Sequence, residues 1–217
     1  MDFSDYERLG VAVRFDDKGG GNLPNANGPS WTNDGAADAP YTLSAVSSGR
    51  VAGVGRGAVT VHRGWTASTV FPGTTRDWWV YRSAQLHGGV EGDCNLIVFQ
   101  DGQGYLDEDG DVRAAVLLDN LVHAGQLPPM VAVFINPGQH PDNAGQRSFE
   151  YDTMDSAYSS FLAGEILPIV EADHRISPDP ARRCLAGTSS GGICAFNAAW
   201  HRLPSARMSF CCTPLSL

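Results

Sequence analysis

Residues 183–194 read RCLAGTSSGGIC, a short strand-like run followed by a turn rich in glycine and serine. The segment 183–186 predicts a strand, and 193–200 predicts a helix. Residues 187–191 fit the pattern G-x-S-x-G, in which a serine sits on a sharp, strained turn between a strand and a helix. Only Ser189 has glycine both two residues before it and two residues after it, so it is the candidate catalytic nucleophile. The alternative is a turn of purely structural role.

Two backbone segments are candidates for holding an oxyanion. The N–H groups at the start of the helix after such a serine face the developing negative charge, which makes the Ser190 N–H the natural first donor. Hydrolases with this turn place a second donor in the loop after an earlier buried strand. Here that loop contains Asp101-Gly102-Gln103, and we assign the donor to the Gly102–Gln103 backbone. The alternative is an ordinary Asp-Gly turn.

The chain before the serine turn predicts a wound sheet. Residues 59–62 and 78–81 are β-rich runs, and 95–99 and 131–135 are continuously apolar, as in strands covered on both faces. With the strand at 183–186 and the helices between, this pattern predicts an α/β fold. We expect an α/β-hydrolase-type, mostly parallel sheet with helices on both faces. Its chemistry should lie at the carboxyl ends of the strands.

Two helices are predicted between these strands. The first spans about 112–124, and the second spans about 156–173 with a kink at Pro168. The first helix has Asp111 as its expected N-cap and an apolar face of Val112, Val116, Leu117 and Leu121. The second should bury Tyr158, Phe161, Leu162, Leu167, Ile169 and Val170.

The two ends of the sequence differ from the middle. Residues 1–57 are rich in Gly, Asn, Asp, Ser and Pro and predict an irregular or mobile arm, and 58–202 predict a partial α/β-hydrolase domain. Residues 203–217 show no helix or strand period and no acidic residue, and we expect them to be a non-family tail. A frameshifted or prematurely ended reading frame would explain that tail and the lack of the last strands.

The segment from Thr69 to Trp200 resembles the enterochelin-esterase-like family of α/β-hydrolases. The matching motifs are FPGTTRDWWVY at 71–81, FQDG at 99–102, FINPG at 134–138, RSFEYD at 147–152 and GTSSGG at 187–192. The resemblance implies hydrolysis of carboxylic esters through an acyl-enzyme. It also implies that Arg147 and Glu150 lie near the substrate; the alternative for these two residues is a surface ion pair.

The acid and histidine that complete a serine triad are missing where this fold should carry them, after the serine. Downstream of Ser189 there is no Asp or Glu, and the only histidine is His201. In a continuous helix His201 would lie about 18 Å from the serine, too far for a general base. His140, paired with Asp142 or Glu150, is the best substitute base in the chain; otherwise it is a solvent-exposed loop histidine. We therefore expect impaired activity.

Two rival functions remain open alongside the esterase. One is a non-catalytic remnant or binding protein that keeps the pocket, and the other is an acyltransferase on the same scaffold. The expected partner is a small-molecule ester. The strand at 183–186, left at a sheet edge, would also favour a homodimer through that edge.

Composition excludes several other classes. A net charge of −9 disfavours nucleic acid or an anionic membrane surface as partner. No apolar run is long enough to span a membrane, and the absence of a signal peptide predicts a cytoplasmic protein with reduced thiols. No cofactor is expected. No metal site is expected either, because the acidic turn at 107–111 lacks the spacing of a calcium loop.

Overall fold

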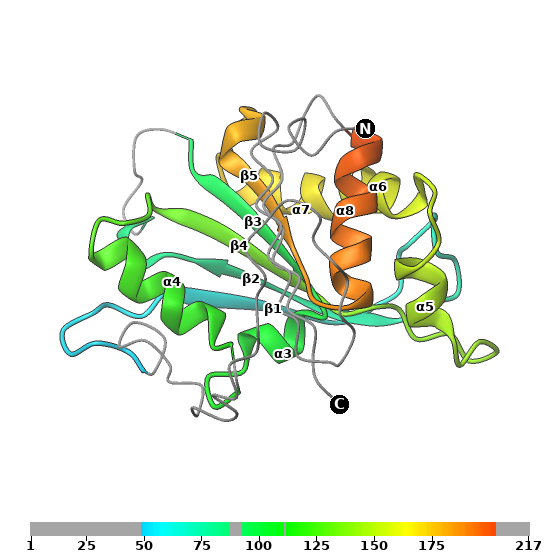
Figure 1. Ribbon diagram of the computed structural model, residues 1–217, viewed down its shortest axis with the longest axis horizontal. Helices are drawn as coiled ribbons and strands as arrows, with labels where there is room; N and C mark the ends of the chain where they lie inside the picture. The colour runs from blue at the N-terminus through cyan, green and yellow to red at the C-terminus, as the bar shows by residue number, and fades with distance from the viewer. Residues whose placement is uncertain (1–48, 87–92, 111, 203–217) are drawn as a thin grey trace, which may run out of the picture.

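A computed structural model describes residues 49–86, 93–110 and 112–202. Its centre is a five-stranded sheet with strand order β1-β2-β4-β3-β5 (Figure 1). The strands are β1 (Ala58–Trp65), β2 (Arg76–Arg82), β3 (Asn95–Gln100), β4 (Met130–Ile135) and β5 (Arg183–Ala186). The predicted N-terminal arm up to residue 48 and the predicted tail at 203–217 lie outside the described residues.

The strands predicted at 95–99, 131–135 and 183–186 pair in parallel, as the sequence predicts. β4, β3 and β5 run parallel, with Phe99 opposite Phe134 on one side and Ala186 on the other. β1 and β2 are antiparallel additions, because β2 pairs antiparallel with both β1 and β4. Every residue of β4 is buried, as expected for a strand covered on both faces. The predicted mostly parallel α/β sheet is confirmed.

Helices cover both faces of this sheet (Figure 1). One face carries α3 (Gly102–Leu106) and α4 (Ala114–His123), whose residues Tyr105, Leu118 and Val122 pack with Phe99 and Phe134. The other face carries four α-helices and a π-helical turn. These are α5 (Gln146–Tyr151), α6 (Ala157–Phe161), the π-helical turn Leu162–Ile166, α7 (Leu167–Asp173) and α8 (Ser190–Arg202). Short 3₁₀ turns lie at Ala84–Leu86 and Pro180–Arg182.

The predicted helix at 156–173 is one helical run whose register changes in the middle. The π-helical turn separates α6 from α7, and Pro168 lies in the first turn of α7. Proline has no N–H for the preceding turn, so a local change of hydrogen-bond register accommodates it. Burial of Tyr158, Phe161 and Val170 is confirmed, whereas the expectation for Ile169 is wrong because its side chain is 37% exposed.

The apolar face predicted for α4 is partly wrong. The helix starts at Ala114, its N-cap is Arg113 at φ 51°, and the expected cap Asp111 lies outside the described residues. Val116 is buried as expected, but Val112 precedes the helix and is exposed. The residues that face the sheet are instead Ala114, Ala115, Leu118 and Val122.

Two polar residues of α4, Asp119 and Asn120, are buried because residues 49–57 lie over them. Asp119 accepts hydrogen bonds from the Arg50 guanidinium at 2.7 Å, from the Gly57 N–H at 2.8 Å and from the Tyr81 hydroxyl at 2.7 Å. Asn120 accepts from the Val51 N–H at 2.9 Å. Residues 49–57 therefore lack regular structure but are attached to the domain.

A buried ion pair joins the first residue of β2 to α5, the helix that follows β4. Arg76 and Glu150 have fully buried side chains, and the guanidinium donates two hydrogen bonds to the carboxylate at 2.9 and 3.0 Å. Glu150 also accepts from the Gly138 N–H at 3.2 Å and from the Gln146 side chain at 3.0 Å. Phe161 lies 4.3 Å below the Arg76 guanidinium. These contacts fix the loop that leads from β4 toward the carboxyl edge of the sheet.

Candidate active site

Ser189 lies at the junction of β5 and α8 in a strained backbone conformation. Its φ angle is +53°, one of three positive values among the described non-glycine residues, and its side chain is exposed. Such conformations are costly for residues other than glycine and concentrate at functional sites. Ser189 is therefore an exposed, strained residue just after the carboxyl end of a parallel strand, and its role as nucleophile stays a prediction.

The glycines around Ser189 are needed for steric reasons. A Cβ atom on Gly187 would lie 2.3 Å from the Gly191 carbonyl oxygen, a distance that real Cβ atoms do not show. A Cβ atom on Gly191 would lie 3.0 Å from a carboxylate oxygen of Asp101 and 3.3 Å from the Gln100 Cβ. The first glycine lets the turn close on itself, and the second lets it approach the end of β3.

The end of β3 carries a second strained residue beside the serine turn. Asp101 has φ +58°, and its N–H donates to the Tyr151 hydroxyl at 3.1 Å. Gly102 follows it so closely against β4 that a Cβ atom would lie 2.3 Å from the Ile135 nitrogen. The loop assigned to the second oxyanion donor is thus packed between β4 and the serine turn.

The candidate oxyanion donors differ in their hydrogen bonding. Ser190 is the first residue of α8, while the N–H groups of Gly192 and Ile193 already donate to the Ser189 carbonyl at 2.9 and 3.1 Å. The Gln103 N–H donates to the Asn136 side-chain oxygen at 3.0 Å. The Asn136 amide nitrogen in turn donates to the Gln103 side chain at 3.3 Å.

Arg147 and Glu150, which the family resemblance groups together, occupy different environments. Arg147 forms a bidentate ion pair with Asp101, with N–O distances of 2.8 and 2.7 Å, and is partly exposed beside the serine turn. Hydrogen bonding to Asp101 raises the pKa of Arg147. Glu150 belongs to the buried pair with Arg76, so its side chain has no access to solvent. Neither residue forms the isolated surface ion pair considered from the sequence, because Glu150 is buried and Arg147 bonds to the end of β3.

His140 is held within its own loop. Its Nδ1 atom accepts a hydrogen bond from the Asp142 N–H at 3.1 Å. Its Nε2 atom packs against Gly73, where a Cβ atom would come within 2.9 Å. His201 lies in α8, twelve residues after Ser189, as expected. Among the described residues, the hydrogen bonds of His140 lead neither to Ser189 nor to a carboxylate.

Two buried tyrosines, Tyr151 and Tyr158, make hydrogen bonds that the sequence did not predict at the ends of the strands. Tyr151 is fully buried, accepts from the Asp101 N–H and donates to the Ile135 carbonyl at 3.5 Å, linking the ends of β3 and β4. The Tyr158 hydroxyl donates to the Gln100 side-chain oxygen. Burial raises the pKa of both tyrosines well above the ordinary value, so they remain protonated donors. In the sequence, a feature that could have indicated buried polar contacts here is Gln100, a polar residue at the end of an apolar strand.

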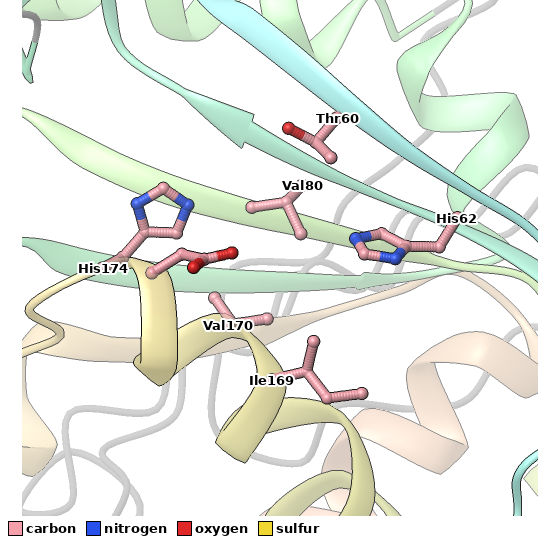
Figure 2. A pocket seen from close by; sticks show the side chains of 7 residues that line it. Thr60, His62, Val80, Ile169, Val170 and His174 are labelled. Atoms are coloured by element: carbon pink, nitrogen blue, oxygen red, sulfur yellow. The ribbon is translucent and has the colours of Figure 1, made fainter.

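A small cavity lies elsewhere in the molecule. It has a volume of about 20 Å³, room for roughly one water molecule, and lies between β1, β2 and α7 (Figure 2). His62 and His174 face it from opposite sides, with Val170 below. Because β1 and β5 are opposite edges of the sheet, this cavity is separated from Ser189 by about 19 Å of sheet width. It is too small and too distant to be the substrate pocket of Ser189.

Within the described residues, no group of three His, Cys, Asp or Glu side chains is arranged to hold a metal ion. None of the helices in the same part of the chain is long and apolar enough to cross a membrane.

Solved structures with a similar fold are esterases. The enterobactin esterase FES from Shigella flexneri, crystallised with enterobactin, aligns with a TM-score of 0.57 and 21% identity, covering 74% of this chain and 38% of that one. The ferric enterobactin esterase from Salmonella typhimurium gives 0.53 and 24%, covering 65% and 32%. A ferulic acid esterase gives 0.54 and 19%, covering 71% and 56%.

The chain spans about a third of the length of the two enterobactin esterases and somewhat over half of the ferulic acid esterase. Because the identities are below 25%, the similarity to these structures is a likeness of fold only. Comparison with curated proteins gives no match.

A family model also matches this chain. The model described as "Putative esterase" matches residues 85–205, more than half of the chain, including the ends of β3 and β4 and the turn at Ser189. The chain, an α/β-hydrolase fold with a strained serine at the carboxyl edge of its sheet, belongs to this esterase family.

Proposed function

We propose that this protein is a serine carboxylic-ester hydrolase that works through an acyl-enzyme on Ser189. The observation that carries the proposal is the exposed Ser189 at φ +53° between β5 and α8. Membership of the esterase family supports the reaction class. The substrate is a small-molecule ester whose acyl and alcohol parts are not assigned.

In the proposed reaction, the Ser189 oxygen attacks the acyl carbonyl carbon to form a tetrahedral intermediate, and the hydroxyl proton passes to solvent water, from which the departing alcohol later takes up a proton. The Ser190 N–H and the backbone of Gly102–Gln103 stabilise the negative oxygen of that intermediate. The intermediate collapses to an acyl-serine and releases the alcohol, which takes up a proton. Water then attacks the acyl-serine, releasing the carboxylic acid and restoring the hydroxyl.

Among the described residues, no histidine is hydrogen-bonded to Ser189, so we propose slow turnover. His140 remains a candidate substitute base, although its Nδ1 atom is engaged by the Asp142 N–H. Oxyanion donors and substrate binding alone sustain an acceleration of about 10³–10⁴-fold over water in enzymes that have lost their triad. Weak hydrolysis of activated esters is therefore expected.

Arg147 is proposed to contact the substrate from the rim of the site, since it is partly exposed and is fixed by Asp101 next to the serine turn. Glu150 is proposed to act only through the loop that it holds, because it is buried against Arg76.

The test is hydrolysis of p-nitrophenyl esters by the wild-type protein and by Ser189→Ala. We expect measurable hydrolysis that the substitution abolishes. Equal rates for the two proteins would end the enzymatic proposal.

A second candidate is a binding protein that keeps the site without chemistry. The hydrogen bonding of His140 within its own loop favours this candidate. Among the described residues, no base is then hydrogen-bonded to Ser189. A fluorophosphonate probe followed by mass spectrometry separates the candidates: modification of Ser189 requires an activated serine, and an unmodified serine favours binding alone. An acyltransferase would instead form a new ester when an alcohol acceptor is added.

We also propose that the protein self-associates through β5. β5 is an edge strand of the described sheet and is paired there with β3, and edge strands are the usual sites at which a second chain adds to a sheet.

A further inference from the structure

The side chain of Asn136 makes a two-point contact with the loop that carries a candidate oxyanion donor. Asn136 directly follows β4, and its side-chain oxygen accepts the Gln103 N–H at 3.0 Å. Its amide nitrogen donates to the Gln103 side-chain oxygen at 3.3 Å. The two residues are 33 positions apart in the chain, and the contact joins the ends of two neighbouring strands.

The atom that Asn136 presents is chemically close to the substrate. The amide oxygen of asparagine and the carbonyl oxygen of an ester are both neutral acceptors on a trigonal carbon, and each seeks an N–H donor. The Gln103 N–H is a single donor, and a proton shared between two acceptors bonds each of them less well. An acyl oxygen that uses this donor must therefore displace Asn136.

From this contact we infer that Asn136 is a plug for the oxyanion donor, a positioning residue that occupies the Gln103 N–H until a substrate oxygen replaces it. The inference rests on the proposed serine mechanism and on the Gln103 backbone as one of its donors. The inference assigns a role to Asn136, a residue that takes no part in the proposed reaction of Ser189.

The plug is weak enough to be displaced. Both of its hydrogen bonds are between neutral groups at an exposed position, so water can replace them when Asn136 leaves. A neutral hydrogen bond of this kind changes an equilibrium by only about two- to tenfold. The negatively charged oxygen of the tetrahedral intermediate forms a stronger, charge-assisted bond with the same N–H. The contact is therefore lost most readily at the transition state.

The competing explanation is structural. Asn136 could hold the Gln103 N–H in the direction that the oxyanion needs, in which case removing it would slow the reaction. The two explanations predict opposite signs for the same substitution, so kinetics separates them.

The experiment measures the second-order rate at which an uncharged alkyl fluorophosphonate modifies Ser189, followed by intact-protein mass. We expect Asn136→Ala to be modified about two- to tenfold faster than the wild-type protein, because the donor is free. Asn136→Asp should be modified more slowly than wild type, because a carboxylate binds the N–H more tightly and repels the developing negative charge.

Asn143→Ala is the matched control. Asn143 lies in the same loop after β4, but its side chain bonds to Gly145 at 3.0 Å and to Gln146 at 3.0 Å rather than to Gln103. We expect its rate to equal that of wild type.

Amide hydrogen exchange at Gln103, measured by NMR, provides a readout that does not depend on activity. Asn136→Ala should speed exchange at this amide, and Asn143→Ala should not. Unchanged exchange in Asn136→Ala, or exchange that rises while Ser189 modification slows or stays the same, would overturn the plug. If Ser189 is not modified in any variant, the serine mechanism itself fails, and the plug fails with it.

Discussion

At the scale of single residues, the serine turn depends on the absence of two side chains. Gly187 and Gly191 lie two residues on either side of Ser189, and a Cβ atom on either would press on backbone or on the end of β3. The strain at Ser189 is therefore maintained by close packing of the residues around it. This is the usual way in which a costly φ angle persists in a folded protein.

Gly187→Ala should destabilise the protein and reduce Ser189 modification. The new methyl group would lie 2.3 Å from the Gly191 carbonyl oxygen, which forces the backbone to shift at a cost of about 1–3 kcal/mol or more. Gly104→Ala is the control, since nothing lies within 4 Å of its Cβ position, and alanine favours the helix by about 0.5–1 kcal/mol. Urea unfolding midpoints should move in opposite directions, and a shift in the same direction would contradict the steric argument.

The two histidines at the small cavity predict a pH dependence of stability. Burial lowers the pKa of His62, with Asp173 opposing, and burial together with Arg82 lowers the pKa of His174. Protonation is therefore harder in the folded state than in the unfolded one. The stability is complete above the ordinary histidine pKa of about 6.5 and falls as the pH drops through it toward the lower folded values.

We expect NMR titration of the His62 ring, which stacks on Trp78 at 3.7 Å, to give a midpoint below 6.5. His62→Gln should flatten the fall in unfolding free energy between about pH 6.5 and 5. A midpoint at or above the ordinary value would show that the ring is not desolvated.

At the scale of elements, the carboxyl edge of the sheet is assembled by loops that polar contacts hold together. The Arg76–Glu150 pair ties the start of β2 to α5 and to the loop after β4. The Arg147–Asp101 pair then ties α5 to the end of β3. Through these contacts the loops from three strands are fixed around Ser189.

Glu150→Ala should cost about 3–5 kcal/mol of unfolding free energy, because it leaves the Arg76 guanidinium buried without its partner. Arg63→Ala removes an exposed ion pair with Asp77, whose N–O distance is 3.3 Å, and should cost less than about 1 kcal/mol. Chemical denaturation of the two variants measures the contrast. Similar losses in both would mean that the buried pair is not a special constraint.

At the scale of the whole molecule, the two edges of the sheet differ. β1 is mostly exposed along its length, and its bulge between His62 and Trp65 interrupts regular pairing. Bulges and irregularities of this kind discourage strand addition. β5 pairs with β3 in an uninterrupted register, so it is the edge at which a second copy is expected to pair.

Sedimentation velocity over a range of protein concentrations should therefore reveal reversible association. The expected result is a sedimentation coefficient that rises with concentration, because addition of a second copy at the β5 edge would stabilise a dimer. A single monomeric species at all concentrations would contradict association through this edge.

The sequence by itself determined the features that depend on neighbours along the chain. Continuous apolar runs predicted β3 and β4, Pro168 predicted the irregularity between α6 and α7, and the glycine spacing predicted the turn at Ser189. Each of these rests on local sterics or on a short periodic pattern, which a sequence records directly. The nucleophile role of Ser189 itself remains a prediction.

Only the tertiary structure decided which polar residues are buried and what they bind. Glu150 meets Arg76 across 74 positions, and Asp119 meets the Gly57 N–H across 62. Asn136 reaches Gln103 only because β4 and β3 are neighbours. In each case a partner distant in the sequence supplies the hydrogen bonds that make burial or docking favourable. Sequence periodicity records which residues lie on one face of an element, but it does not record what packs against that face.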